Sequence, residues 1–246
     1  DWSSDVCSSD LEVLEAAITD KTRLIIINYP NNPTGRILHE DEAELLERIL
    51  LKHRELRLLS DEVYEKIVYG QKSVSMGART AVADRVITVN GFSKSVAMTG
   101  WRMGYLAASR EVFDGAYKFF QHSLSCVSGF LQAGALEALQ CSRETEEMRA
   151  VYETRRNLFI GMLNDIPGVR CTLPEGAFYA WVFFDAGGMD AVGICEYLMK
   201  EARVVGLPGT AYGEENAVCM RFSFASATEE LITAAKRIRE ALAKLG

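Results

Sequence analysis

The chain has 246 residues, a formal net charge of -7 at pH 7, and 48% hydrophobic and 25% charged residues. These values are ordinary for a soluble globular protein and allow one large domain or two smaller ones. The acidic balance argues against a protein that binds nucleic acid by neutralising phosphates. No apolar stretch of the sequence is long enough to span a bilayer. We therefore predict an enzyme or binding protein without a nucleic-acid or membrane partner.

The opening stretch DWSSDVCSSD does not fit a folded domain. It has no periodic apolar pattern and no signal-peptide layout. The stretch matches the translation of a common sequencing-library adapter. We predict that residues 1–10 are an adapter-derived segment and not native to the protein.

The first half of the remaining chain alternates strands with helices. A short helix is predicted over residues 12–20 and a second helix over residues 39–53. Between and after them come strand-sized apolar stretches, at residues 23–28, 56–60, 85–89 and 104–108. This alternation predicts an α/β fold with a mainly parallel sheet. Residues 11–145 are assigned to this large domain, of which we expect only a part to be present.

The second half has a different pattern. Residues 111–140 read as helical with breaks, and residues 143–163 as one long amphipathic helix that links the two halves. The remaining elements are an antiparallel pair at 169–185, a helix at 191–201, a strand at 218–225 and a terminal helix with a Ser226-x-x-Glu229 capping box. We predict a C-terminal α+β small domain over residues 146–246.

The six cysteines are scattered, without a C-x-x-C pair or a histidine at zinc-finger spacing. We interpret them as buried free thiols and place the protein in the reducing cytoplasm. The three histidines lie in unrelated segments, so no metal site is predicted.

Four short stretches carry side chains suited to chemistry, and three of them follow predicted strands, where open α/β sheets bind ligands. Each also has a purely structural interpretation. NNPTG after the first strand could be only a turn, and Asp61 in DEVY could be a helix N-cap. Lys94 in NGFSK could be a solvated lysine. Arg221, inside the apolar strand MRFS, could pair with a structural carboxylate.

Taken together and in this order, the stretches NYPNNPTG, SDEVYEKIVY, NGFSKSVAMTGWRMGY, LPEGAFYAW and MRFSFA resemble the class I/II aminotransferases, which are pyridoxal-phosphate-dependent enzymes of fold type I. The resemblance covers nearly everything after Leu11, and its most specific part is the Ser-Lys…Thr-Gly-Trp-Arg-x-Gly-Tyr stretch. It implies a three-layer αβα large domain, pyridoxal phosphate as the cofactor, and a homodimer.

The resemblance also implies roles for individual residues. Lys94 would form a Schiff base with the cofactor and then move the proton between the substrate Cα and the cofactor. Asp61 would pair with the protonated pyridine nitrogen. Asn32 and Tyr64 would hydrogen-bond the 3-oxygen of the ring. Lys94, Asp61 and Tyr64 are therefore the expected catalytic residues.

Two arginines complete the implied site. Arg102 would bind the cofactor phosphate, and Arg221, together with Asn32, would bind the amino-acid substrate, with the guanidinium clamping its α-carboxylate. One position departs from the family pattern, because Gly91 stands where many relatives have a phosphate-binding serine. We expect Ser93 or backbone N–H groups to make this contact instead.

Family members also use residues upstream of the NNPTG turn, including a Gly-rich phosphate turn and an aromatic residue that stacks on the cofactor ring. Only 18 residues lie between the adapter-like stretch and Tyr29, which is too few for a further strand-helix-strand set. We therefore expect an N-terminally truncated chain with an open sheet edge and uncovered apolar faces. Such a chain would bind the cofactor poorly and be inactive by itself.

The leading functional prediction is an aminotransferase that acts by a ping-pong reaction between an amino acid and a 2-oxo acid. A β-lyase of the same fold is an alternative, although such relatives often carry histidine where Tyr64 stands. A second alternative is the aminotransferase-like effector domain of a transcription regulator, against which the intact NPTG and TGWR stretches argue. The sequence leaves the amino donor open among aspartate, aromatic, alanine and branched-chain substrates.

Overall fold

The structure is a computed structural model that describes residues 8–185 and 187–245. The chain divides into two compact units. The first consists of Asp1–Pro30, Ile37–Glu65 and Lys72–Thr145, and the second of Asn31–Arg36, Lys66–Gln71 and Glu146–Gly246.

This division differs from the contiguous one predicted, because two short loops within residues 11–145 belong to the second unit. The backbone explains the difference. The N–H groups of Glu175 and Gly176 both donate to the carbonyl oxygen of Gly35, at 2.9 and 2.7 Å, and Tyr69 N–H donates to the Glu175 carbonyl oxygen at 2.8 Å. Both loops are therefore tied to the turn around Glu175.

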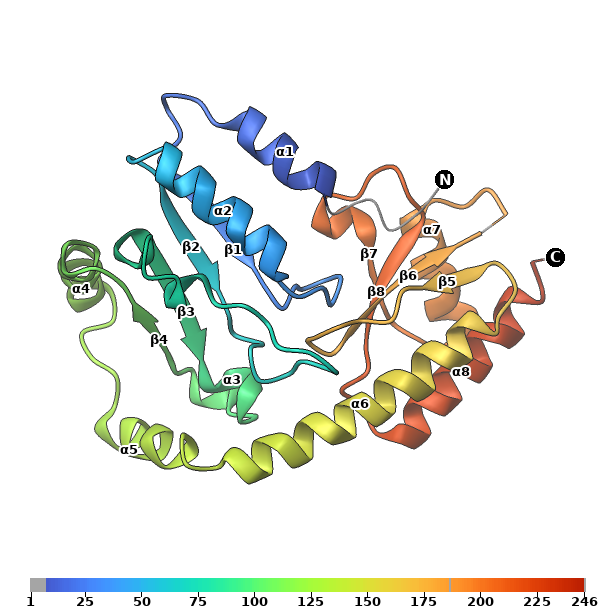
Figure 1. Cartoon of the computed structure of the whole chain (residues 1–246). Coiled ribbons are helices and arrows are strands. Elements are labelled where there is room, and N and C mark those ends of the chain that lie inside the picture. The colour runs from blue at the N-terminus through green and yellow to red at the C-terminus, as the bar shows by residue number, and fades with distance from the viewer. Residues whose placement is uncertain (1–7, 186, 246) are drawn as a thin grey trace. The chain divides into compact units, whose positions relative to one another are not determined.

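The first unit contains a four-stranded sheet in the order β1-β2-β3-β4. Its strands are β1 (Leu24–Asn28), β2 (Arg57–Asp61), β3 (Val86–Gly91) and β4 (Gly104–Ala107) (Figure 1). The first three strands are parallel and β4 is antiparallel, so the predicted mainly parallel α/β sheet is confirmed. The register sets Asn28 beside Asp61 and Asp61 beside Val89, so the carboxyl ends of the parallel strands lie level at one edge.

Helix α2 (Glu40–Lys52) packs on this sheet through Leu46, Ile49 and Leu50. These side chains recur on one face of the helix and are at most 1% exposed, in one cluster with Leu58 and Val86 of the sheet. Helix α1 (Ser8–Ala17) lies beside α2 (Figure 1). It begins earlier than predicted, so residues 8–10 of the adapter-like stretch are helical, whereas residues 1–7 fall outside the described part of the chain.

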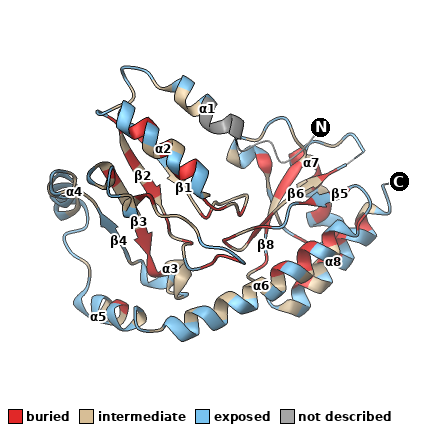
Figure 2. Cartoon of the chain, viewed as in Figure 1, coloured by how far each residue is buried: buried red, intermediate tan, exposed pale blue. Residues whose placement is uncertain are grey.

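The first unit also contains helices α4 (Arg110–Ser123) and α5 (Gly129–Ala138), which are largely exposed (Figure 2). Phe119 on α4 is 76% exposed and Phe130 on α5 is 74% exposed. On the outer strands, Ile26 of β1 is 67% exposed and every residue of β4 is exposed. The unit thus presents apolar side chains and open strand edges that no described segment of it covers.

The second unit contains an antiparallel sheet in the order β5-β6-β8-β7. Its strands are β5 (Val169–Cys171), β6 (Tyr179–Phe184), β7 (Leu207–Pro208) and β8 (Cys219–Ser223). Its helices are α7 (Ala191–Tyr197), a π-helical turn (Leu198–Ala202), α8 (Thr228–Leu242) and all but the first four residues of the long helix α6 (Ser142–Asn164). One sheet face packs on the long helix, since the rings of Phe159 and Phe222 meet edge to face at 6.4 Å. Phe159, Leu163 and Ile238 are at most 1% exposed and form the centre of this core.

Short elements complete the described chain. They are the one-turn helix α3 (Phe92–Ser95) and the 3-10 turns η1 (Met76–Ala78), η2 (Ala83–Arg85), η3 (Thr99–Trp101) and η5 (Gly209–Tyr212). None of the described helices is long and apolar enough to cross a membrane.

Two local predictions were wrong. The N-cap of α8 is Ala227, which makes no side-chain cap, so Ser226 and Glu229 each stand one position too early to form the predicted capping box. The thiols are also less buried than predicted. Cys171 and Cys219 are buried, but Cys126 on the loop between α4 and α5 is exposed.

Candidate active site

Asp61 is the last residue of β2, at the carboxyl edge of the first sheet. Its carboxylate Oδ1 accepts a hydrogen bond from the Val63 N–H at 3.2 Å, and its carbonyl oxygen accepts one from Tyr29 N–H at 3.1 Å. Residues 63–66 form turns, so Asp61 does not cap a helix. The strand end and this turn hold its carboxylate at the edge where open α/β sheets bind ligands.

Lys94 lies in α3, directly after β3, and is half-buried. Its ammonium Nζ is 5.9 Å from the centroid of the Tyr64 ring, close enough for a cation–π attraction. Tyr64 is only 4% exposed, so its ring is held in place where it contacts Lys94. The structure therefore brings together two of the predicted site residues from different loops of the first unit.

The glycine at position 91 has a packing reason. A Cβ at Gly91 would lie 3.1 Å from the carbonyl oxygen of Met103, and a Cβ at Gly104 would lie 2.9 Å from the carbonyl oxygen of Asn90. Strands β3 and β4 approach so closely here that a serine at position 91 would push its neighbours apart. The Ser93 hydroxyl makes no side-chain hydrogen bond to any described residue, so it is available to a ligand.

Arg102 ends the turn η3 in the left-handed conformation, with φ of 54°. The residue is exposed, and its Nη1 donates to the Thr99 carbonyl oxygen at 3.1 Å. The neighbouring Trp101 ring packs on α5, where a Cβ at Gly134 would come within 2.5 Å of it. The turn and the packing of the Trp101 ring thus fix the backbone at Arg102, while the arginine itself stays exposed.

In the second unit, the NNPTG stretch is a turn that also presents a functional side chain. Asn31 Oδ1 accepts hydrogen bonds from the N–H and hydroxyl of Thr34 at 3.0 and 2.8 Å. Gly35 has φ of 74° and lies so close to Pro174 that a Cβ would come within 2.5 Å of it. The turn leaves Asn32 to accept a hydrogen bond from Arg221 Nη1 at 2.7 Å.

Arg221 pairs with no acidic side chain among the described residues, so the interpretation as a structural ion pair is not supported. Its guanidinium carbon instead lies 4.3 Å from the centroid of the Tyr179 ring and 5.2 Å from that of Tyr212. The cation is thus held by a neutral amide and two aromatic rings. This leaves it able to receive an external anion.

The predicted site residues therefore form two groups. Asp61, Tyr64, Ser93, Lys94 and Arg102 belong to the first unit, and Asn32 and Arg221 belong to the second.

Sequence reasoning missed Glu62, which is only 5% exposed. The hydroxyls of Ser60 and Ser75 both donate to its Oε1 at 2.9 Å, so the carboxylate ties the loop at residue 75 to the end of β2. Burial raises the pKa of Glu62, which the two hydroxyls partly oppose and the nearby Glu65 carboxylate reinforces. Two polar residues at alternate positions at the end of an apolar strand, Ser60 and Glu62, were the available signal.

The raised pKa of Glu62 predicts how the stability of the protein changes with pH. Because the folded state favours the protonated Glu62, the stability from this group is present below its ordinary pKa of 4.5 and is lost as the pH rises through the raised value. Glu62→Gln keeps the shape but cannot ionise. We expect the melting temperature of the variant, relative to the unchanged protein, to rise as the pH increases from about 4 to 8.

Glu44→Gln is the matched control, since Glu44 is exposed on α2. Melting curves of the three proteins across this pH range provide the measurement. The assignment would be contradicted if the melting temperature of Glu62→Gln minus that of the unchanged protein stayed constant or fell with rising pH.

The donor set of the first unit fits pyridoxal phosphate. The molecule carries an aldehyde, a basic pyridine nitrogen, a ring oxygen and a phosphate, and the sheet edge supplies an amine, a carboxylate, a phenol and a guanidinium from Lys94, Asp61, Tyr64 and Arg102. On a mainly parallel α/β sheet, this set is that of a pyridoxal-phosphate-dependent protein.

The comparison with known families identifies the group. The family model of aminotransferase class I and II matches residues 2–238, so the chain belongs to this family, whose members depend on pyridoxal phosphate. It is 42% identical to an aspartate aminotransferase of Musicola paradisiaca, over 94% of this chain and 58% of that protein. It is 41% identical to aromatic-amino-acid aminotransferase 2 of Thermococcus litoralis, over 94% of this chain and 60% of that protein.

Solved structures agree. The chain superposes on the aromatic aminotransferase from Pyrococcus horikoshii with a TM-score of 0.91 and 38% identity, covering 96% of this chain and 64% of that one. With the aspartate aminotransferase from Rhizobium meliloti the TM-score is 0.89 and the identity 35%, covering 95% and 61%. The chain spans about 60% of the length of the curated relatives it matches.

Proposed function

We propose that the protein is an amino-acid aminotransferase, which moves the amino group of an amino acid to a 2-oxo acid in a ping-pong reaction. The family supports this proposal, as do the relatives named as aspartate and aromatic aminotransferases. The structural observation that carries it is the half-buried Arg221, which has no acidic partner among the described residues and so suits a substrate carboxylate.

Pyridoxal phosphate, when bound, supplies an aldehyde that captures amines and a ring that accepts electrons from the substrate Cα. Lys94 is the amine that would attach to this aldehyde before substrate arrives. After the substrate amine displaces it, the Lys94 amine would take the proton from the substrate Cα and deliver it during transfer. The contact of its Nζ with the Tyr64 ring keeps this amine at the sheet edge.

The other site residues of the first unit would bind the cofactor and orient it. Asp61 would pair with the pyridine nitrogen and keep it protonated, which is a task for a carboxylate held in place by a backbone N–H. Tyr64 would donate to the ring oxygen. Arg102 and Ser93 would bind the phosphate, for which a guanidinium and a hydroxyl are suitable donors.

The second unit contributes the substrate contacts. Arg221 binds the α-carboxylate of the amino acid through the guanidinium donors that Asn32 does not use. Fixing the carboxylate would fix the orientation of Cα and so decide which of its bonds is broken. Asn32 holds Arg221 through this hydrogen bond and would also hydrogen-bond the ring oxygen of the cofactor.

We further propose that the protein acts as a cytoplasmic homodimer. The exposed phenylalanines of α4 and α5 support an assembly that covers them. All five cysteines of the described chain are free, which suits a reducing compartment.

The direct test is a panel of amino donors against 2-oxoglutarate with added pyridoxal phosphate, assayed by glutamate formation. Aspartate, an aromatic amino acid, alanine and a branched-chain amino acid are the donors. The complete gene product should form glutamate with at least one of them. A protein that binds the cofactor but produces no glutamate from any donor would refute the proposal.

A further inference from the structure

One face of the sheet in the second unit carries a row of aromatic side chains around Arg221. Trp181 on β6 pairs directly with Arg221 on β8. Tyr179 lies two residues before Trp181 and points to the same face, since side chains alternate along a strand. Leu207 of β7 pairs with Arg221 from the other side. Strand register alone therefore sets the surroundings of the guanidinium.

Tyr212, from the 3-10 turn η5, adds a second ring. The guanidinium carbon lies 4.3 Å from the centroid of Tyr179 and 5.2 Å from that of Tyr212, and both distances are within the range of cation–π attraction. The Trp181 ring meets Tyr212 edge to face at 5.7 Å and 85°. Trp181 thus holds Tyr212 in place, and Tyr212 in turn contacts the cation.

The hydrogen bond that Arg221 makes uses only part of its guanidinium N–H donors. Its Nη1 donates to Asn32 Oδ1 at 2.7 Å, whereas a guanidinium has five N–H donors. Aromatic rings attract the cation without taking these in-plane donors. The guanidinium is therefore restrained in orientation while most of its donors remain able to meet an anion.

We propose that Tyr179 and Tyr212 are positioning residues that hold the Arg221 guanidinium ready for two parallel hydrogen bonds to a carboxylate. The inference rests on the proposed function, in which Arg221 binds the α-carboxylate of the amino acid. The two tyrosines act through Arg221 and do not themselves contact the substrate in this role. Their effect is to restrict the arginine before binding, so that less side-chain freedom is lost when the substrate arrives.

The test compares a ligand that has the carboxylate with one that lacks it. 2-Aminoisobutyrate has no proton on Cα and cannot be transaminated, and its amide is a ligand of nearly the same shape that lacks the carboxylate. Calorimetry measures the dissociation constants of both for the complete gene product with added pyridoxal phosphate. Tyr212→Leu should weaken the binding of 2-aminoisobutyrate roughly 2- to 30-fold and leave that of the amide unchanged. Tyr212→Phe keeps the ring and should restore most of the affinity.

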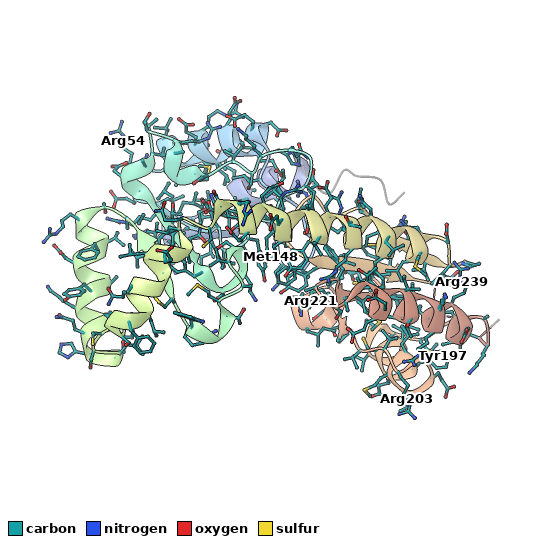
Figure 3. The ribbon with its side chains drawn as sticks, turned by 90° about the horizontal axis from the view of Figure 1, so that it is seen from below. Arg54, Met148, Tyr197, Arg203, Arg221 and Arg239 are labelled. Atoms are coloured by element: carbon teal, nitrogen blue, oxygen red, sulfur yellow. The ribbon has the colours of Figure 1, made fainter. Side chains whose placement is uncertain are left out.

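Tyr197→Leu is the matched control. Tyr197 lies on α7 in the same unit, away from Arg221 in Figure 3, and its hydroxyl donates to the Ala241 carbonyl oxygen at 2.7 Å. This variant should lose stability but not selectivity for the carboxylate. The inference is overturned if Tyr212→Leu binds both ligands as the unchanged protein does, or if it weakens both equally. If carboxylate binding depends on Tyr212 but no donor yields glutamate, the proposed function fails and this inference stands.

Discussion

Replacing Lys94 by alanine is expected to lower turnover by about four orders of magnitude or more, which is the upper range for loss of a general acid–base group. Lys94 has two proposed tasks, attachment of the cofactor and movement of the Cα proton, and alanine can do neither. The complete gene product should show visible absorption from cofactor attached to the lysine. Lys94→Ala should lack this absorption while still folding.

Lys118→Ala is the control for this experiment, since Lys118 is exposed on α4 and has no proposed role. It should keep both the absorption and the turnover. The same measurement on the 246-residue chain tests the expectation that this chain binds the cofactor poorly. A stoichiometric absorption band in this chain that disappears with Lys94→Ala would show that expectation to be wrong.

Replacing Arg221 by alanine is expected to raise the KM for the amino donor roughly 30- to 4000-fold, because truncating a partly buried charged hydrogen-bonding partner costs about 2–5 kcal/mol. The affinity for pyridoxal phosphate should change little, because Arg221 is assigned to the substrate. Arg221→Lys should recover only part of the loss, since an ammonium cannot form two parallel hydrogen bonds to a carboxylate.

The control is Arg237→Ala, which removes an exposed arginine from α8 in the same unit. Steady-state kinetics and a cofactor titration of each variant separate the two effects. A variant of Arg221 with unchanged KM but weakened cofactor binding would assign this residue to the cofactor instead.

Local sequence patterns located most of the regular elements. Helix α2 was predicted to within one residue at each end because its apolar residues recur on one helical face and pack on the sheet. The buried strand β2 was shifted by only one residue, because five consecutive positions alternate in burial. Strand β7 was missed, since two residues are too few to produce a periodic pattern. The capping box was placed one position early because local pattern rarely fixes a helix end.

The chemistry of individual residues could also be read from the sequence. The order of five residues along the chain, an aspartate, a tyrosine, a lysine and two arginines, matched the family. This match indicated pyridoxal phosphate as the cofactor and amino acids as the substrate class. The sequence gives no direct sign of Glu62 binding Ser75, because the partner lies thirteen residues away beyond an irregular loop. The cation–π contact of Tyr212 with Arg221 was equally hidden, since it comes from a short turn without a periodic pattern.

By itself, the sequence determined the family and the α/β order of the first unit, and it predicted the residues that would bind pyridoxal phosphate. Those properties depend on side-chain type and short-range spacing. Only the tertiary structure decided which side chains share a position in space. Asn32 and Arg221 are separated by 189 residues and meet at 2.7 Å, because the NNPTG turn folds with the second unit and not with the strand that precedes it. Chain folding sets such long-range contacts, and no local pattern encodes them.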